Sequence, residues 1–298
     1  MTKRIRGTFS VMVTAFDGNG AVDLKAMAAF TEWQVAEGIH GLIPLGSTGE
    51  FLSMTDAERH DVAKCVIDTV NDRVPVFIGT GAEYTDDVIR YSQQAEALGA
   101  DGVMIIPPFY STPTEDELFE HFRRIAEAIT IPVMLYNNPA TANIDLTPAI
   151  VARLSTIPRV DYIKESTMDV TRVRDILDLC GDRMTVFGGI MGYESFMNGA
   201  EGWIAVGSNL MPREFSRLFE LSVDEQDIDA ARALYRQILP VIRLVGGHRY
   251  VAATKSGLGM LGHAVGKPRA PRLPTPDAEI DNVRAALIAA GITPQQTV

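Results

Sequence analysis

The sequence contains few cysteines and no long apolar run. Cys65 and Cys180 stand far apart without a CxxC spacing, so we expect two buried free thiols in a reducing compartment. No apolar segment approaches the roughly 20 residues that span a membrane. The start, Met1–Arg6, carries positive charge but no apolar run follows it, which is not the pattern of a signal peptide. We therefore expect a cytoplasmic protein with no membrane partner.

The sequence also lacks an excess of positive charge. Its net charge is -11 and its pI is about 5.0, and it has no basic run. Such a chain is poorly suited to bind nucleic acid or an anionic membrane surface. The 298 residues are 46% hydrophobic and 22% charged, which is ordinary for a globular protein with a large core. Length alone allows two domains, but α/β barrels of this size commonly form one.

Three stretches share one pattern: a glycine, two further residues, a second glycine and an apolar run. They cover residues 37–45, 98–106 and 198–206. We expect the first glycine to end a helix in the left-handed conformation and the second to open a buried strand. The pattern is typical of the helix-to-strand junction of a βα unit.

Eight short apolar runs alternate with segments typical of helices. The expected strands cover residues 9–14, 42–45, 74–78, 103–106, 133–136, 160–166, 184–187 and 203–206. The expected helices cover residues 23–37, 53–70, 85–98, 114–129, 147–154, 169–179 and 192–198. This alternation predicts an α/β fold, a (β/α)8 TIM barrel. A doubly wound sheet is the alternative, because alternation alone does not close a barrel.

The alternation stops near residue 211. Beyond it only helices are expected, over residues 213–222, 227–245, 250–261 and 277–290, with a proline-rich loop over 267–276. We therefore predict a barrel over residues 1–211 and a C-terminal helical extension over residues 212–298, packed on the barrel.

One lysine lies near the end of an expected strand. Val160, Tyr162 and Ile163 favour a buried strand, so the Lys164 ammonium group is expected to be partly desolvated. Burial disfavours the charged form and lowers the pKa of a lysine. An amine activated in this way attacks a carbonyl carbon and forms a Schiff base. The alternative is a strand-end lysine whose head simply reaches water.

Other candidate residues follow other expected strands. Active sites of barrels lie at the C-terminal ends of the strands. The turn Gly46-Ser47-Thr48-Gly49-Glu50 offers backbone N–H groups and hydroxyls to an anion. Tyr110 and Tyr136 either relay protons or cover the barrel mouth, and Val206 ends the last strand. Convergence of these strand ends with Lys164 predicts one substrate site.

Three motifs carry a resemblance to a known family. Gly46–Glu50, Tyr136-Asn137-Asn138-Pro139 and Ile163-Lys164-Glu165-Ser166 resemble the signature stretches of the dihydrodipicolinate synthase / N-acetylneuraminate lyase family. Members are class I, Schiff-base-forming aldolases on a (β/α)8 barrel with C-terminal helices. The resemblance covers essentially the whole chain. It implies a lyase acting on pyruvate or another 2-keto acid without metal or cofactor, and a homotetramer built as a dimer of dimers.

The resemblance also implies a role for each matched residue. Lys164 would form the imine, and Tyr136 would shuttle the proton. Ser47 and Thr48, beside Gly46, would hold the carboxylate through N–H groups and hydroxyls. Tyr110 would complete the proton relay, in this family often across a subunit interface.

Two departures from the family pattern concern the substrate. Dihydrodipicolinate synthases carry an arginine five residues after the tyrosine, where this chain has Thr141, which cannot replace a bidentate arginine fork. Sialic acid lyases carry an acidic pair where this chain has Gly188 and Gly189. We expect Thr141, Gly188 and Gly189 to line the substrate site. We therefore expect an aldolase or dehydratase of 2-keto-3-deoxy sugar acids, or a deaminase of pyrroline-4-hydroxy-2-carboxylate. The alternative within the family is 4-hydroxy-tetrahydrodipicolinate synthase.

Interpretations from other classes differ in what they require. A zinc-dependent class II aldolase is disfavoured, because the five histidines are scattered without ligand spacing. A non-catalytic keto-acid-binding paralogue would keep the fold and lose turnover. A phosphate- or flavin-binding barrel would use Gly188 and Gly189 after the seventh strand.

Overall fold

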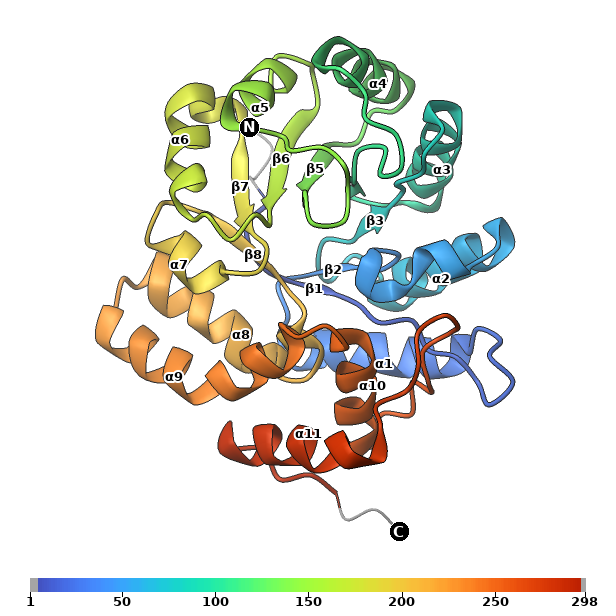
Figure 1. Cartoon of the computed structure of the whole chain (residues 1–298), viewed down its shortest axis with the longest axis vertical. Helices are drawn as coiled ribbons and strands as arrows, with labels where there is room; N and C mark the ends of the chain where they lie inside the picture. The colour runs from blue at the N-terminus through green and yellow to red at the C-terminus, as the bar shows by residue number, and fades with distance from the viewer. Residues whose placement is uncertain (1–4, 296–298) are drawn as a thin grey trace. The chain divides into compact units, whose positions relative to one another are not determined.

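Over residues 5–295, eight strands alternate with helices and belong to one sheet. The structure, a computed structural model, describes residues 5–295 (Figure 1). Two units can be distinguished by the proximity of their residues. One is Met1–Gly7 with Pro75–Ile204, and the other is Thr8–Val74 with Ala205–Val298. The division predicted at residue 211 stays a prediction.

The first unit contains six parallel strands in sequence order. They are β3 (Phe77–Gly79), β4 (Gly102–Ile105), β5 (Val133–Asn137), β6 (Val160–Glu165), β7 (Thr185–Gly188) and all but the last residue of β8 (Gly202–Ala205), each paired with the next. Its helices are α3 (Thr85–Leu98), α4 (Glu115–Ala128), α5 (Pro148–Leu154), α6 (Thr171–Cys180) and α7 (Gly192–Phe196). Figure 1 shows α3 to α6 in an arc around these strands.

The second unit contains β2 (Gly41–Ile43) and nearly all of β1 (Gly7–Val11), which pair in parallel. Its helices are α1 (Leu24–Ala36), α2 (Asp56–Val70), α8 (Pro212–Phe219), α9 (Ile228–Val245), α10 (Tyr250–Met260) and α11 (Asp277–Ala289). Within residues 5–295 no helix combines the length and the apolar character needed to cross a bilayer.

The predicted fold class is confirmed: the protein is a (β/α)8 TIM barrel with C-terminal helices. A doubly wound sheet would reverse its strand order at a switch point, whereas β3 to β8 follow one another in order. Some predicted strand limits were wrong. The first strand ends at Val11 rather than near residue 14, because the backbone beyond it turns to other partners, such as Asn209 Oδ1 for Val13 N.

The two cysteines differ in burial. Both are free thiols, and Cys180 is buried as predicted. Cys65, on α2, is only half-buried, because its Sγ lies at the edge of the contact with α1, 3.4 Å from Leu24 O. The prediction of two buried thiols was therefore wrong for Cys65.

The repeated glycine pattern has the predicted conformation. The first glycines, Gly38, Gly99 and Gly199, have φ angles of 83°, 94° and 97°, in the left-handed region. The second glycines open β2, β4 and β8, also as predicted.

The second glycine of each repeat lies under an aromatic ring of the neighbouring strand. The pairs in register are Phe9 with Gly41, Phe77 with Gly102 and Phe187 with Gly202. A Cβ atom would approach the ring to 2.4, 2.6 and 2.2 Å respectively. Each of these positions therefore needs glycine for side-chain packing, a requirement that the sequence pattern alone does not show.

We expect Gly102→Ala to destabilise the fold, because its Cβ would lie 2.6 Å from the buried Phe77 ring. Overpacking of this kind lowers the free energy of unfolding by about 1–3 kcal/mol, measurable by urea denaturation. Gly18→Ala is the control, since nothing lies within 4 Å of a Cβ there. Adding Phe77→Leu to Gly102→Ala should recover part of the loss. Equal stability of Gly102→Ala and wild type would contradict the packing argument.

Candidate functional site

The parallel register of β5 and β6 places Tyr136 directly beside Lys164. The Lys164 Nζ lies 3.9 Å from the centroid of the Tyr136 ring. Both side chains are 6% exposed. The structure therefore brings together the two residues at the centre of the predicted chemistry.

Burial sets the charge state of Lys164. Removal of water disfavours its ammonium form and lowers the pKa from 10.5 to about 7. The neighbouring carboxylate, Glu165, points to the opposite face of β6, because side chains alternate along a strand. Its oxygens accept hydrogen bonds from Asn137 Nδ2 at 2.9 Å and from Thr167 N at 2.7 Å. A substantial fraction of the Lys164 amine is therefore neutral and nucleophilic near pH 7.

The hydroxyl of Tyr136 is held in place by a neighbour on the same loop. Asn138 Nδ2 donates a hydrogen bond of 2.9 Å to the Tyr136 hydroxyl oxygen. The backbone oxygen of Asn138 accepts from Thr141 N at 3.0 Å and from the Thr141 hydroxyl at 3.3 Å. Thr141 itself is exposed, so the predicted specificity residue lies on a turn that also carries the partner of Tyr136.

A buried polar network fixes the loop after β5. Asn137 Oδ1 accepts from Leu146 N at 2.9 Å, which closes the loop that carries Asn138 and Thr141. Beyond it, Asp145 receives two hydrogen bonds from the Arg172 guanidinium, at 2.6 and 2.5 Å. These bonds hold the pKa of the Asp145 carboxyl below its usual value. The charged pair keeps this loop anchored to α6.

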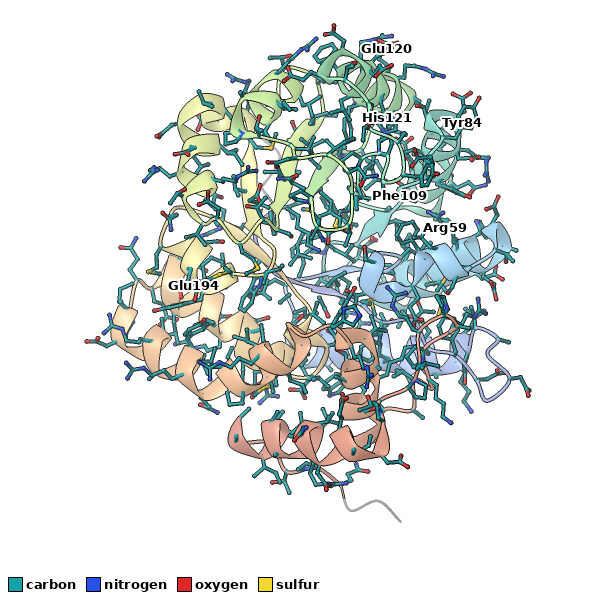
Figure 2. The ribbon with its side chains drawn as sticks, viewed as in Figure 1. Arg59, Tyr84, Phe109, Glu120, His121 and Glu194 are labelled. Carbon is teal, nitrogen blue, oxygen red and sulfur yellow. The ribbon has the colours of Figure 1, made fainter. Side chains whose placement is uncertain are left out.

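The side chain of Tyr110 is directed to the surface, where it is 85% exposed. Its loop, marked by Phe109 in Figure 2, is fixed by the Glu83 carboxylate. Glu83 accepts three backbone hydrogen bonds, from Phe109 N at 2.9 Å, Tyr110 N at 3.0 Å and Ser111 N at 2.8 Å. Asn143 Nδ2 adds a bond of 2.9 Å to Tyr110 O. Hydrogen bonds thus hold the backbone at Tyr110, whereas its ring is not buried within its own unit.

Gly188 and Gly189 take part in close backbone packing after β7. A Cβ on Gly189 would lie 1.8 Å from Ser166 Oγ, and one on Gly188 would lie 2.8 Å from Ser195 Cβ. Gly189 O also accepts a hydrogen bond from Trp203 Nε1 at 2.8 Å. Both positions therefore require glycine, because residues of β6, α7 and β8 or next to them approach the backbone closely.

The remaining predicted site residues belong to the second unit. Ser47, Thr48 and Gly49 form a single turn of 3-10 helix after Gly46. Its first internal bond runs from Gly49 N to Gly46 O at 2.9 Å, so the N–H groups of Ser47 and Thr48 precede the internal hydrogen bonds. Thr48 is 3% exposed. Val206 follows β8 and is half-buried.

Several polar residues at these strand ends were missed by the sequence reasoning. Glu83, Asn143 and Arg172 each hold a loop by hydrogen bonds to residues distant in the sequence, whereas Asn138 holds the Tyr136 hydroxyl two residues away. The only local signal was the position of Asn138 within the tyrosine motif. Among residues 5–295 no group of three or more His, Cys, Asp and Glu side chains is placed to hold a metal ion.

Comparison with known proteins connects this geometry to one family. A family model described as the dihydrodipicolinate synthetase family matches residues 4–290. The chain is 33% identical over 293 residues to the 4-hydroxy-tetrahydrodipicolinate synthase of Thermodesulfovibrio yellowstonii, covering 96% of this chain and 99% of the relative. It is 35% identical over 301 residues to the synthase of the same name from Anaeromyxobacter dehalogenans, covering 97% and 99%.

A solved structure agrees over the same length. The chloride-inhibited dihydrodipicolinate synthase from Acinetobacter baumannii, complexed with pyruvate, matches with a TM-score of 0.94 and 30% identity. The match covers 97% of this chain and 100% of that chain. The chain therefore belongs to the dihydrodipicolinate synthetase family and is a class I, lysine Schiff-base lyase, as the resemblance of its strand-end motifs predicted.

Proposed function

We propose that Lys164 forms an imine with the keto carbon of pyruvate or of another 2-keto acid. The observation that carries this proposal is the buried Lys164 amine, with a pKa of about 7, against the Tyr136 ring. A neutral amine is the form that attacks a carbonyl. The pyruvate bound by the Acinetobacter baumannii structure supports a small keto acid as the partner.

The proposed reaction proceeds through an enamine. The Lys164 amine adds to the keto carbon, and the carbonyl oxygen is protonated and leaves as water. The resulting protonated imine withdraws electrons from the adjacent carbon, whose loss of a proton gives the enamine. We assign the proton transfers to the Tyr136 hydroxyl. The hydrogen bond of 2.9 Å from Asn138 Nδ2 holds its oxygen in place, and a positioned hydroxyl is an effective general acid and base.

We propose that the turn after β2 holds the carboxylate of the substrate. Ser47 and Thr48 supply backbone N–H groups and hydroxyls, and Gly46 allows close approach of the ligand. We also propose that Tyr110 completes the proton relay in a neighbouring subunit. Its 85% exposed ring, on a loop fixed by Glu83, supports contact with a second copy of this chain. This role of Tyr110 requires the predicted homotetramer. The homotetramer and the cytoplasmic location remain predictions.

The first candidate for the complete reaction is that of 4-hydroxy-tetrahydrodipicolinate synthase, condensation of the enamine with aspartate semialdehyde. The names of the relatives favour it over the broader lyase that the sequence reasoning put first.

A second candidate is favoured by one observation, the uncharged turn over residues 138–143 after β5. Thr141 stands where a guanidinium would hold a second carboxylate, and its hydroxyl bonds to Asn138 O. This favours a 2-keto acid with hydroxyl groups, processed by cleavage, dehydration or deamination.

We expect borohydride with pyruvate to add the mass of the reduced adduct to Lys164, because reduction fixes the imine. Lys164→Ala should abolish this adduct and reduce turnover by about 10⁴-fold or more, as loss of a covalent nucleophile does. Lys64→Ala, at an exposed lysine paired with Asp68, is the control and should leave both unchanged. Absence of an adduct, or an adduct that persists in Lys164→Ala, would contradict the proposed function.

Glu83→Gln should impair turnover without preventing imine formation. A carboxamide has one acceptor oxygen and would direct an NH2 group at backbone N–H donors, so the Tyr110 loop loses part of its support. We expect kcat to fall about tenfold, the effect of losing roughly one charge-assisted bond. Glu117→Gln is a matched control, because Glu117 accepts from Thr114 N at 2.7 Å and does not bond the Tyr110 backbone. Equal kcat values in the two variants would exclude a role for Glu83 in placing Tyr110.

A substrate panel separates the two candidate reactions. The panel contains pyruvate with aspartate semialdehyde, 2-keto-3-deoxy sugar acids, pyrroline-4-hydroxy-2-carboxylate and sialic acid, with products identified by mass. The neutral Thr141 turn predicts that a hydroxylated 2-keto acid reacts well. If only the aspartate semialdehyde pair reacts, the synthase assignment holds and the argument from Thr141 is wrong. Normal binding without turnover would indicate a non-catalytic paralogue.

A further inference from the structure

A buried ion pair of the second unit has no part in the chemistry derived so far. Glu50 Oε1 and Lys255 Nζ lie 2.9 Å apart, and their side chains are 0% and 1% exposed. Glu50 directly follows the turn Ser47–Gly49, whereas Lys255 comes from α10 in the C-terminal region. The carboxylate and the ammonium group are therefore in direct ion-pair contact.

The C-terminal region also supplies the second partner of this carboxylate. Arg269 N donates to Glu50 Oε2 at 2.9 Å. Lys255 Nζ donates to Lys267 O at 3.1 Å, which ties α10 to the same segment. The ring of Phe16 lies against both cations, 4.2 Å from Lys255 Nζ and 4.3 Å from Arg269 Cζ. The Glu50 carboxylate is therefore held by Lys255 and by the backbone of Arg269, and the Phe16 ring lies against the side chains of both residues.

The turn that Glu50 ends has an unusual backbone. Leu45 and Glu50, on either side of Gly46–Gly49, have φ angles of 61° and 60°. Residues other than glycine rarely adopt this left-handed region, and they keep it only where surrounding contacts impose it. Thr14 Oγ1 adds a hydrogen bond of 2.8 Å to Gly49 O. Contacts outside the turn therefore hold its conformation, and the Glu50 carboxylate makes two of them, to Lys255 Nζ and to Arg269 N.

Stability alone does not account for such a pair. Desolvation of two charges offsets most of their attraction, and apolar residues of similar size are often as stabilising. Burial lowers the pKa of Lys255 to about 8, so its ammonium group is still mostly charged at neutral pH. A charged, directional contact does what an apolar one cannot: it fixes the position of one particular carboxylate and of the backbone attached to it.

We propose that Glu50, held by Lys255 and Arg269, is a positioning residue that keeps Ser47 and Thr48 in the conformation that binds the substrate carboxylate. The segment from α10 to Arg269 is then part of the carboxylate-binding machinery. This inference rests on the proposed role of Ser47 and Thr48.

The test replaces both charges by apolar side chains of similar size, in Glu50→Met/Lys255→Met. We expect a melting temperature close to that of wild type but a KM for the keto acid raised about tenfold or more, because the turn loses its ionic anchor. Borohydride trapping at Lys164 should persist at saturating pyruvate. A wild-type KM in the folded double variant would overturn the proposal and leave the pair a structural role.

Two further variants complete the test: one for the case in which the double variant does not fold, and one as a control. Glu50→Gln retains size and an oxygen for Arg269 N, so it should fold even if the double variant does not, and it should raise KM by a smaller factor. An unchanged KM in Glu50→Gln also overturns the proposal. Arg249→Met breaks the Arg249–Glu279 ion pair of 2.7 Å in the same C-terminal region, and its KM should not change. Failure of wild type to form any adduct at Lys164 would instead refute the proposed function.

Discussion

The burial of Lys164 is the constraint on which the proposed chemistry of this protein depends. A lysine in water is almost fully protonated at neutral pH, and only removal of water brings its pKa to about 7. The same strand that buries Lys164 directs Glu165 to the opposite face, where its carboxylate bonds to Asn137 rather than to the lysine. A carboxylate on the lysine face would raise the pKa again. The alternation of a β-strand therefore separates the proposed nucleophile from a carboxylate that would keep its amine protonated.

Three carboxylates near the strand ends accept hydrogen bonds from backbone N–H groups, and none of them pairs with Lys164. Glu165 follows the lysine and accepts from Thr167 N, and Glu83 accepts three N–H groups around Tyr110. Glu50 accepts from Arg269 N at the end of the turn that carries Thr48. An acidic side chain thus fixes a loop after β2, after β4 and after β6. These contacts hold the strand ends, and no carboxylate among residues 5–295 forms an ion pair with Lys164, whose lowered pKa reflects its burial.

Local signals in the sequence were sufficient for the fold and for the central pair of the site. Strand-length apolar runs and the repeated glycines predicted the βα units, and parallel register then placed Tyr136 beside Lys164. The contacts that fix the loops could not be predicted in this way. Glu50 and Lys255 are distant in sequence, and no periodicity or motif links them. The exposure of Tyr110 was equally hidden, since the direction of a loop side chain depends on bonds such as Glu83 to Tyr110 N.

The measurement that tests this account most directly is the pH dependence of imine formation at Lys164. The rate of borohydride-trapped adduct formation with pyruvate would be followed by mass spectrometry between about pH 5 and pH 10, a range that brackets the shifted and the ordinary lysine pKa. Because the neutral amine is the nucleophile, the account predicts a rate that rises with pH and levels off above a midpoint of about 7. A rate that continues to rise toward the ordinary lysine value of 10.5 would show that Lys164 is not desolvated and would contradict the account.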